Sequence, residues 1–249
     1  MSRARRPIQI RLLGALDVRD RQCREARAVL AQPRRLALLA YLAVAPPKDF
    51  LRRSTLVAMF WPEHDEARGR AALRQALHFL RHGLGPDALL TRGDDEVRLD
   101  DEACWCDVRA FDTAIAEQRF EDAVSLYHGD LLAGFYIADG EAFEPWLERH
   151  RSRLLRAFTS ALETLAIRCE ERSEHADAAG HWHRLVACVP ENGRVVLRLM
   201  QALAHAGDRT EALRQADAYA TLLRREFGAD PDPAVTALVE LLRRPPRPA

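Results

Sequence analysis

The feature that most constrains the fold is a 34-residue repetition in the C-terminal half of the chain. Ala178 and Ala212 lie 34 residues apart, and apolar residues recur at the same offset around them. This period is typical of tetratricopeptide-type helix pairs, in which neighbouring repeats stack to bury a continuous core. The sequence therefore predicts an all-α tetratricopeptide-like repeat domain over residues 103–249. The other matched pairs are Leu162 and Val196, Leu165 and Leu199, Ala166 and Met200, Cys169 and Leu203, Trp182 and Ala216, and Leu185 and Tyr219.

The ends of this repeat region are less regular. A divergent helix pair is expected around Ala123, with Phe111 and Tyr127 in the positions that correspond to the later repeats. A last helix is expected over Pro233–Arg243, where it can cap the open end of the stack. The final segment, RPPRPA, is expected to be a stiff, disordered tail or the start of a linker.

The first hundred residues follow a different pattern. Residues 8–13 alternate as a strand does, short strands are expected at 16–19 and 28–30, and residues 1–7 are expected to be a frayed tail. Strands, three helices and a terminal hairpin predict an α+β winged helix-turn-helix over residues 1–102. We expect residues 1–100 to bind DNA without the rest of the chain. The helices are expected from Pro33 to a stop at Pro46-Pro47, over 54–60 and over 68–84, and the hairpin over 89–99 with its turn at 93–95.

The third of these helices has one apolar and one basic face. At 100° per residue Leu73, Leu77, Leu80 and Leu84 form one stripe, which is typical of docking on a small core. Its basic side suits binding in the major groove of DNA. The alternative interpretation is an ordinary charged face that is exposed to solvent. Arg92 and Arg98, one on each arm of the hairpin, are placed for DNA phosphates, unless the hairpin is a plain domain edge. The polar residues are Arg70, Arg74, His78 and Arg81 beside the stripe, with Arg68 and Gln75 further round.

The charges are divided unequally between the two halves. The net charge of the chain is zero, but residues 1–100 carry a charge of +7 and residues 101–249 a charge of −7. A basic half joined to an acidic half indicates one part that meets a polyanion and one that does not.

The sequence offers no support for an enzyme or a metal protein. The phosphate-loop, dinucleotide, zinc-protease and hydrolase motifs are absent, so we expect no catalytic site and no cofactor. Cys104 and Cys106 are expected to be buried thiols in a helical packing layer rather than ligands, and no metal is expected. Five scattered cysteines without a signal peptide fit a reducing cytoplasm, and no apolar run is long enough for a membrane span.

Several segments resemble known families in a fixed order. The N-terminal hundred residues resemble the OmpR/PhoB-type winged-helix DNA-binding domain through LLGALDV, FWPE, AALRQALHFLRHGLG and EVRLD. Residues from Asp107 resemble the bacterial transcriptional activator domain through DVRAF, YHGDLLAGF, EPWLERHRSRL, LRLMQALAHAGDRTEAL and REFGADPDP. Together they resemble the Streptomyces antibiotic regulatory protein family.

This resemblance implies a cytoplasmic transcription regulator that binds direct repeats upstream of a promoter and recruits RNA polymerase. It implies that the third helix reads bases, and that the helical repeats serve dimerisation or regulation. It also implies that the loop before the third helix can touch the polymerase, although the tryptophan in that loop is expected to be a core residue rather than a contact. The base-reading positions are Arg70, Arg74, His78 and Arg81, and the candidate polymerase contacts are Trp61, Glu63, His64 and Asp65.

Two positions depart from the family pattern. His78-Phe79 stands where relatives have a pair that includes arginine, which removes one phosphate or base contact and leaves Phe79 to meet a thymine methyl group or the wing. Arg52 stands where the second helix usually has a serine or threonine cap. With the zero net charge, the first departure favours the alternative function, a helical-repeat protein-interaction adaptor whose DNA-binding domain is vestigial.

Overall fold

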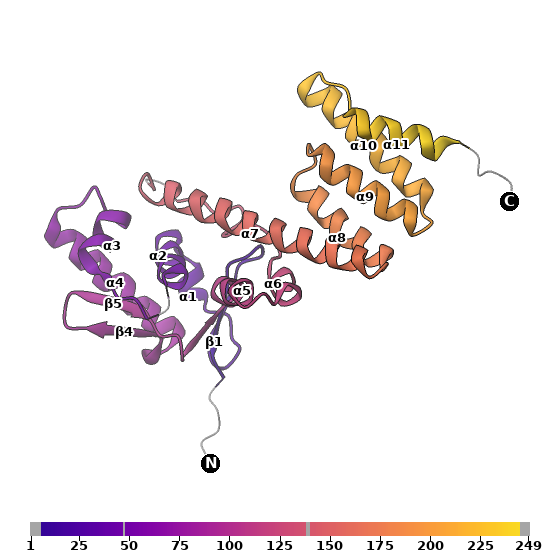
Figure 1. Ribbon diagram of the computed structural model, residues 1–249. Coiled ribbons are helices and arrows are strands. Elements are labelled where there is room, and N and C mark those ends of the chain that lie inside the picture. Colours follow the sequence, from indigo (N-terminus) through magenta and orange to yellow (C-terminus); the bar gives the residue numbers. More distant parts are fainter. Residues whose placement is uncertain (1–5, 47, 138–139, 245–249) are drawn as a thin grey trace, which may run out of the picture. The chain divides into compact units, whose positions relative to one another are not determined.

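The computed structural model describes residues 6–46, 48–137 and 140–244. The chain forms two compact units, Met1–Leu155 and Arg156–Ala249, and helix α7 (Phe143–Glu171) contributes to both (Figure 1). Most of the two predicted tails and Pro47 of the predicted helix stop lie outside the described residues. The predicted domain boundary at 102/103 falls inside the first unit and stays a prediction. No helix in the described ranges is long and apolar enough to span a bilayer.

The first sheet of the N-terminal unit has β1 (Ile8–Arg11) at its centre. Alternation buries Ile8 and Ile10 completely, as the pattern predicts. One neighbour is the expected antiparallel strand β2 (Asp17–Arg19), and the other is the parallel strand β6 (Cys104–Cys106). The prediction of a helical layer for the two cysteines is therefore wrong. Their thiols are buried, but on the two ends of a strand whose side chains alternate.

The strand expected at 28–30 is also wrong, because this segment is the one-turn helix α1 (Arg27–Leu30). After an isolated bridge between Arg19 and Glu25 the chain leaves the sheet edge and turns. The turn buries Val29 against the third helix, where Gly83 has no side chain. A Cβ atom at Gly83 would lie 2.9 Å from Val29 Cγ2. Packing against that helix thus decides the local structure.

The three predicted helices and the hairpin are confirmed. They are α2 (Pro33–Val44), α3 (Arg53–Phe60), α4 (Glu66–Leu84), β4 (Leu89–Arg92) and β5 (Glu96–Leu99). A short strand β3 (Leu51–Arg52), which was not expected, pairs with β5, and the 3-10 helix η1 (Pro86–Ala88) links α4 to the hairpin. The four leucines of the α4 stripe are at most 1% exposed, so this face forms the core as predicted.

A buried carboxylate joins this sheet to the helices that follow it. Helix α5 (Asp107–Ala116) pairs with α6 (Phe120–Leu126), and Phe111 packs on Tyr127 as the repeat pattern predicts. Asp107 is 4% exposed, and its Oδ2 accepts the backbone N–H groups of Leu12 and Leu13 at 2.8 and 2.9 Å. The first 100 residues therefore lack both a strand of their own sheet and the acceptor for two of their buried donors. Their expected DNA binding without the rest of the chain stays a prediction.

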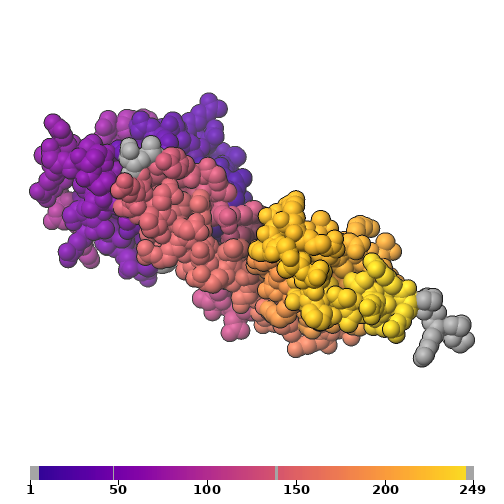
Figure 2. Space-filling view, turned by 90° about the horizontal axis from the view of Figure 1, so that it is seen from above, coloured from indigo at the N-terminus to yellow at the C-terminus, as the bar shows by residue number. Residues whose placement is uncertain are grey.

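The second unit contains the predicted helix repeats. It consists of the C-terminal part of α7, α8 (His175–Cys188), α9 (Gly193–His205), α10 (Arg209–Phe227) and α11 (Pro233–Arg243). Ala178 and Ala212 are fully buried, and the other matched positions are at most 6% exposed, apart from the half-buried Leu203. The side chains of these helices, orange to yellow in the space-filling view, pack closely (Figure 2). The predicted all-α repeat architecture is confirmed here.

We expect the substitution Asp107→Ala to destabilise the N-terminal unit strongly. It leaves two buried backbone N–H groups without an acceptor, and each such group costs about 1–3 kcal/mol. The free energy of unfolding, measured by urea denaturation, should fall by about 2–5 kcal/mol. Asp122→Ala on the exposed face of α6 is the control and should leave the urea midpoint unchanged. Equal midpoints for the two variants would contradict this role of Asp107.

Candidate nucleic-acid interface

Helix α4 begins and ends at residues that suit its termini. The N-cap Asp65 accepts the backbone N–H of Arg68 at 2.8 Å, and Glu66 adds negative charge in the first turn. Both acids complement the positive end of the helix dipole. Gly85 follows the last turn with a φ of +118°, a conformation that side-chain-bearing residues rarely adopt. The helix is therefore defined over 19 residues.

The polar side of α4 faces solvent over most of the predicted site. Arg81 is only half-buried, because on the helical wheel it lies beside the leucine stripe. His78 contacts the ring of Phe79, whose centroid is 5.9 Å away. The side chains that are exposed are those of Arg68, Arg70, Arg74, Gln75 and His78.

A groove of about 820 Å³ lies between this helix and the hairpin. Arg70, Leu73 and Arg74 of α4 form one wall. The hairpin turn forms the other wall, and the start of α3 closes one end of the groove. Five arginines and three acids line it, so its surface is mainly cationic. The remaining lining residues are Arg52, Arg53, Ser54, Arg92, Asp94, Asp95 and Glu96.

The arginines of α4 differ in how their charge is compensated. Arg70 pairs with Glu66 at 2.6 Å, and Arg68 pairs with Asp65 at 3.5 Å. Within the described residues, no acidic side chain lies in ion-pairing distance of Arg74 or Arg81. An anion that binds Arg74 therefore displaces no internal partner. A ligand at Arg70 or Arg68 competes with a carboxylate of the same helix.

The two hairpin arginines predicted to contact phosphates occupy different surroundings. Arg92 lies at the groove, its side chain 66% exposed, paired with Glu96 and stacked 4.7 Å from the ring centroid of Phe50. Arg98 is only 18% exposed and donates to Asp101 Oδ2 at 3.0 Å. The structure thus brings Arg92 together with Arg70 and Arg74, and it leaves Arg98 outside the groove.

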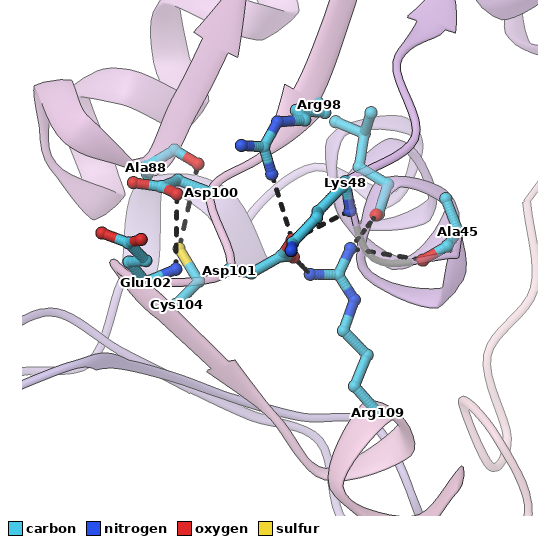
Figure 3. Close-up of polar contacts among 10 residues, drawn as sticks. Ala45, Lys48, Ala88, Arg98, Asp100, Asp101, Glu102, Cys104 and Arg109 are labelled. Atoms are coloured by element: carbon cyan, nitrogen blue, oxygen red, sulfur yellow. Dashed lines mark hydrogen bonds and ion pairs between the residues drawn. The ribbon is translucent and has the colours of Figure 1, made fainter. Parts of the chain in front are cut away.

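Asp101 binds several donors besides Arg98 (Figure 3). Its carboxylate also accepts the backbone N–H of Lys48 at 3.0 Å and pairs with Arg109 of α5. Arg109 in turn donates to the carbonyl oxygens of Leu42 and Ala45, at 3.0 and 3.3 Å, where α2 ends. Arg98 therefore belongs to a cluster that ties the hairpin to α2 and α5.

The loop of predicted polymerase contacts is partly a packing element. Trp61 is 6% exposed and lies against Phe60, with ring centroids 6.1 Å apart. Glu63 pairs with Arg34 at 2.9 Å, and a hydrogen bond from its own backbone N–H, followed by the Arg34 charge, lowers its pKa. Glu63 and His64 are exposed, as is Asp65, which caps α4.

Arg53 lines the groove and Phe50 lies under Arg92, and neither was predicted as a site residue. Arg52, which also lines the groove, was expected only as a missing cap. As predicted, no cap hydrogen bond comes from the Arg52 side chain at the N-terminus of α3. The backbone N–H of Arg53 donates to Asp95 O at 2.8 Å, which ties the start of α3 to the hairpin turn. The adjacent pair Arg52-Arg53 is visible in the sequence as a possible anion contact. Its position opposite α4 depends on the pairing of β3 with β5, which the sequence did not predict.

The cysteine and histidine side chains form no metal site in the described part of the chain, since no three ligating groups come together. Burial raises the pKa of Cys104 and of Cys106 to about 12. The raised pKa disfavours the thiolate at neutral pH, and the thiolate is the form that binds metals and attacks electrophiles.

The surroundings of the hairpin arginines predict opposite effects on stability. Arg98→Ala removes a half-buried partner of Asp101 and should lower the free energy of unfolding by about 1–3 kcal/mol. Arg92→Ala removes an exposed side chain and should leave the urea denaturation midpoint unchanged. A larger loss in Arg92→Ala than in Arg98→Ala would contradict this assignment.

Comparison with known proteins agrees with this architecture. The family described as "Bacterial transcriptional activator domain" matches residues 100–243. The solved structure of Mycobacterium tuberculosis EmbR in complex with a low affinity phosphopeptide matches 96% of this chain with a TM-score of 0.60 and 22% identity, which shows the fold. This chain spans 65% of the EmbR chain. No curated protein matches by sequence. Because the family match covers more than half of its length, the chain belongs to the bacterial transcriptional activator domain family.

Proposed function

We propose that the protein is a sequence-specific, DNA-binding transcription regulator of the Streptomyces antibiotic regulatory protein type. Its N-terminal unit acts as a winged helix, with α4 in the major groove of promoter DNA and the β4–β5 hairpin along the backbone. The observation that carries this proposal is the cationic groove between α4 and the hairpin, in which Arg74 has no internal ion-pair partner within the described residues.

The dimensions and chemistry of α4 support this function. From Arg70 to Arg81 the helix rises about 16 Å, which suits the length of helix that lies in a major groove. Arginine binds guanine and phosphate through two parallel hydrogen bonds, and both Arg70 and Arg74 are exposed. Gln75 and His78 are exposed on the same helix and add groups that can reach base edges.

The other family roles are assigned by position. Exposed Glu63 and His64 are candidate contacts for RNA polymerase, whereas buried Trp61 supports the loop from inside. We assign homodimerisation or regulation to the helical repeats and place the protein in the cytoplasm, where its promoter is. Neither role requires a cofactor.

The double variant Arg70→Gln/Arg74→Gln tests the placement of α4. A mobility shift over a pool of promoter fragments from the source genome should show affinity reduced by about 100-fold or more, since each good base contact is worth about 1–3 kcal/mol. The control is Arg24→Gln/Arg119→Gln, which removes the same charge from exposed arginines outside the groove. It should shift the pool as the wild type does.

Equal binding by the two double variants would overturn the assignment of α4. A wild-type protein that enriches no promoter fragment, but captures a protein partner from DNA-free lysate, would favour the adaptor function. Thermal unfolding of each variant shows whether a loss of binding reflects a loss of fold.

A further inference from the structure

Helix α4 has a second groove on the side away from the hairpin. This smaller groove, of about 230 Å³, lies between α4 and the first turn of α2. At 100° per residue its α4 residues lie roughly opposite those of the hairpin groove. The exposed face around His78 therefore lies between the two grooves. The second groove is lined by Gln32, Arg34, Arg35, Trp61, Ala72, Gln75, Ala76 and Phe79.

A helix seated in the major groove has a sugar-phosphate backbone on each side, because the groove is about 12 Å wide and the helix fills it. Arg92 and Arg52, which line the hairpin groove, can bind the sugar-phosphate backbone on that side of the helix. The second backbone requires cations on the other side of α4. The groove beside α2 lies on that side and is lined by two arginines, Arg34 and Arg35.

Of the two arginines in that groove, Arg35 is the one whose charge is not paired with a carboxylate of the described residues. Its guanidinium carbon lies 3.8 Å from the ring centroid of Phe79, and its Nη1 donates to Ala28 O at 2.8 Å. Within the described residues, no carboxylate lies in ion-pairing distance of it. Its neighbour Arg34, by contrast, pairs with Glu63 at 2.9 Å. Arg35 is therefore held in one orientation while its remaining N–H groups stay available.

Phe79 explains how this orientation arises. It replaces the arginine that the family pattern led us to expect on α4, and its half-buried ring gives the guanidinium from α2 a flat surface to stack on. Stacking fixes a planar guanidinium but not a lysine ammonium, and a side chain ordered in advance loses less entropy when it binds. The cation missing from α4 is thus supplied from α2.

We infer that Arg35, oriented by Phe79, binds a DNA phosphate on the side of α4 away from the hairpin, with Gln75 lining the same site. This inference rests on the proposed DNA-binding function. It adds a phosphate contact that orients the recognition helix without reading sequence.

The test uses the full chain and a fluorescein-labelled DNA duplex of arbitrary sequence, with affinity measured by anisotropy over a series of KCl concentrations. Arg35→Gln should weaken binding about 5- to 10-fold and reduce the slope of log K against log salt by about one. Arg119→Gln, which removes the same charge from the N-cap of α6, should leave the slope unchanged. Phe79→Leu should weaken binding about 3-fold, and the double variant Arg35→Gln/Phe79→Leu should bind no more weakly than Arg35→Gln alone.

The outcomes separate this inference from the proposed function. If Arg35→Gln has the slope of Arg119→Gln while Arg70→Gln/Arg74→Gln binds weakly, the phosphate site is overturned and the DNA-binding function stands. If the wild type shows no salt-dependent binding, the proposed function fails together with the site. Additive losses in the double variant would overturn the orienting role of Phe79.

Arg35→Lys keeps the charge, so its slope of log K against log salt should match that of the wild type even where its affinity falls. A reduced slope would contradict a purely electrostatic phosphate contact.

Discussion

The carboxylate of Asp107 is the interaction on which the N-terminal unit depends. It accepts the N–H groups of Leu12 and Leu13 as well as its own neighbour's N–H, from Val108 at 2.8 Å. Burial raises the pKa of Asp107, and the three N–H donors oppose that shift. Because β1 pairs with β6 directly before this residue, the central strand of the first sheet and the first helix of the matched family region form one structure. The frame that positions α4 therefore includes residues beyond the three helices and the hairpin.

Two further contacts extend this frame to the interface. Asp101 joins Arg98 of the hairpin to Arg109 of α5 (Figure 3). Aromatic contacts join α2 and α3 to the start of α7. The ring centroids of Tyr41 (α2) and Trp146 (α7) are 4.9 Å apart, and those of Phe60 (α3) and Phe143 (α7) are 5.6 Å apart. A displacement of α5 or of the start of α7 must therefore break contacts to the hairpin, α2 or α3. Within this unit, contacts therefore join the family region to the hairpin, α2 and α3.

The sequence predicted those features that local periodicity determines. Helix α4, the hairpin and the repeat helices followed from the 3.6-residue, two-residue and 34-residue periods, and Asp65 followed from capping chemistry. The parallel β1–β6 pair could not be predicted, since it joins residues almost a hundred positions apart. Arg98 was assigned to phosphates because alternation on a hairpin does not reveal that Phe50 and Asp101 cover that face. Arg35 was missed for the same reason, as its partner Phe79 lies on another helix.

The zero net charge of the chain is a poor guide to its binding partner. Charges in solution are screened beyond about 10 Å at ordinary ionic strength, so a polyanion responds to the groups that line its own contact surface. Most exposed arginines of the N-terminal unit are already paired, for example Arg19 with Asp17 and Arg24 with Asp20. Arg74 and Arg35, without a paired carboxylate among the described residues, line the grooves on either side of the exposed face of α4. For the proposed DNA binding, the position of these two cations therefore matters more than the balance of charge does.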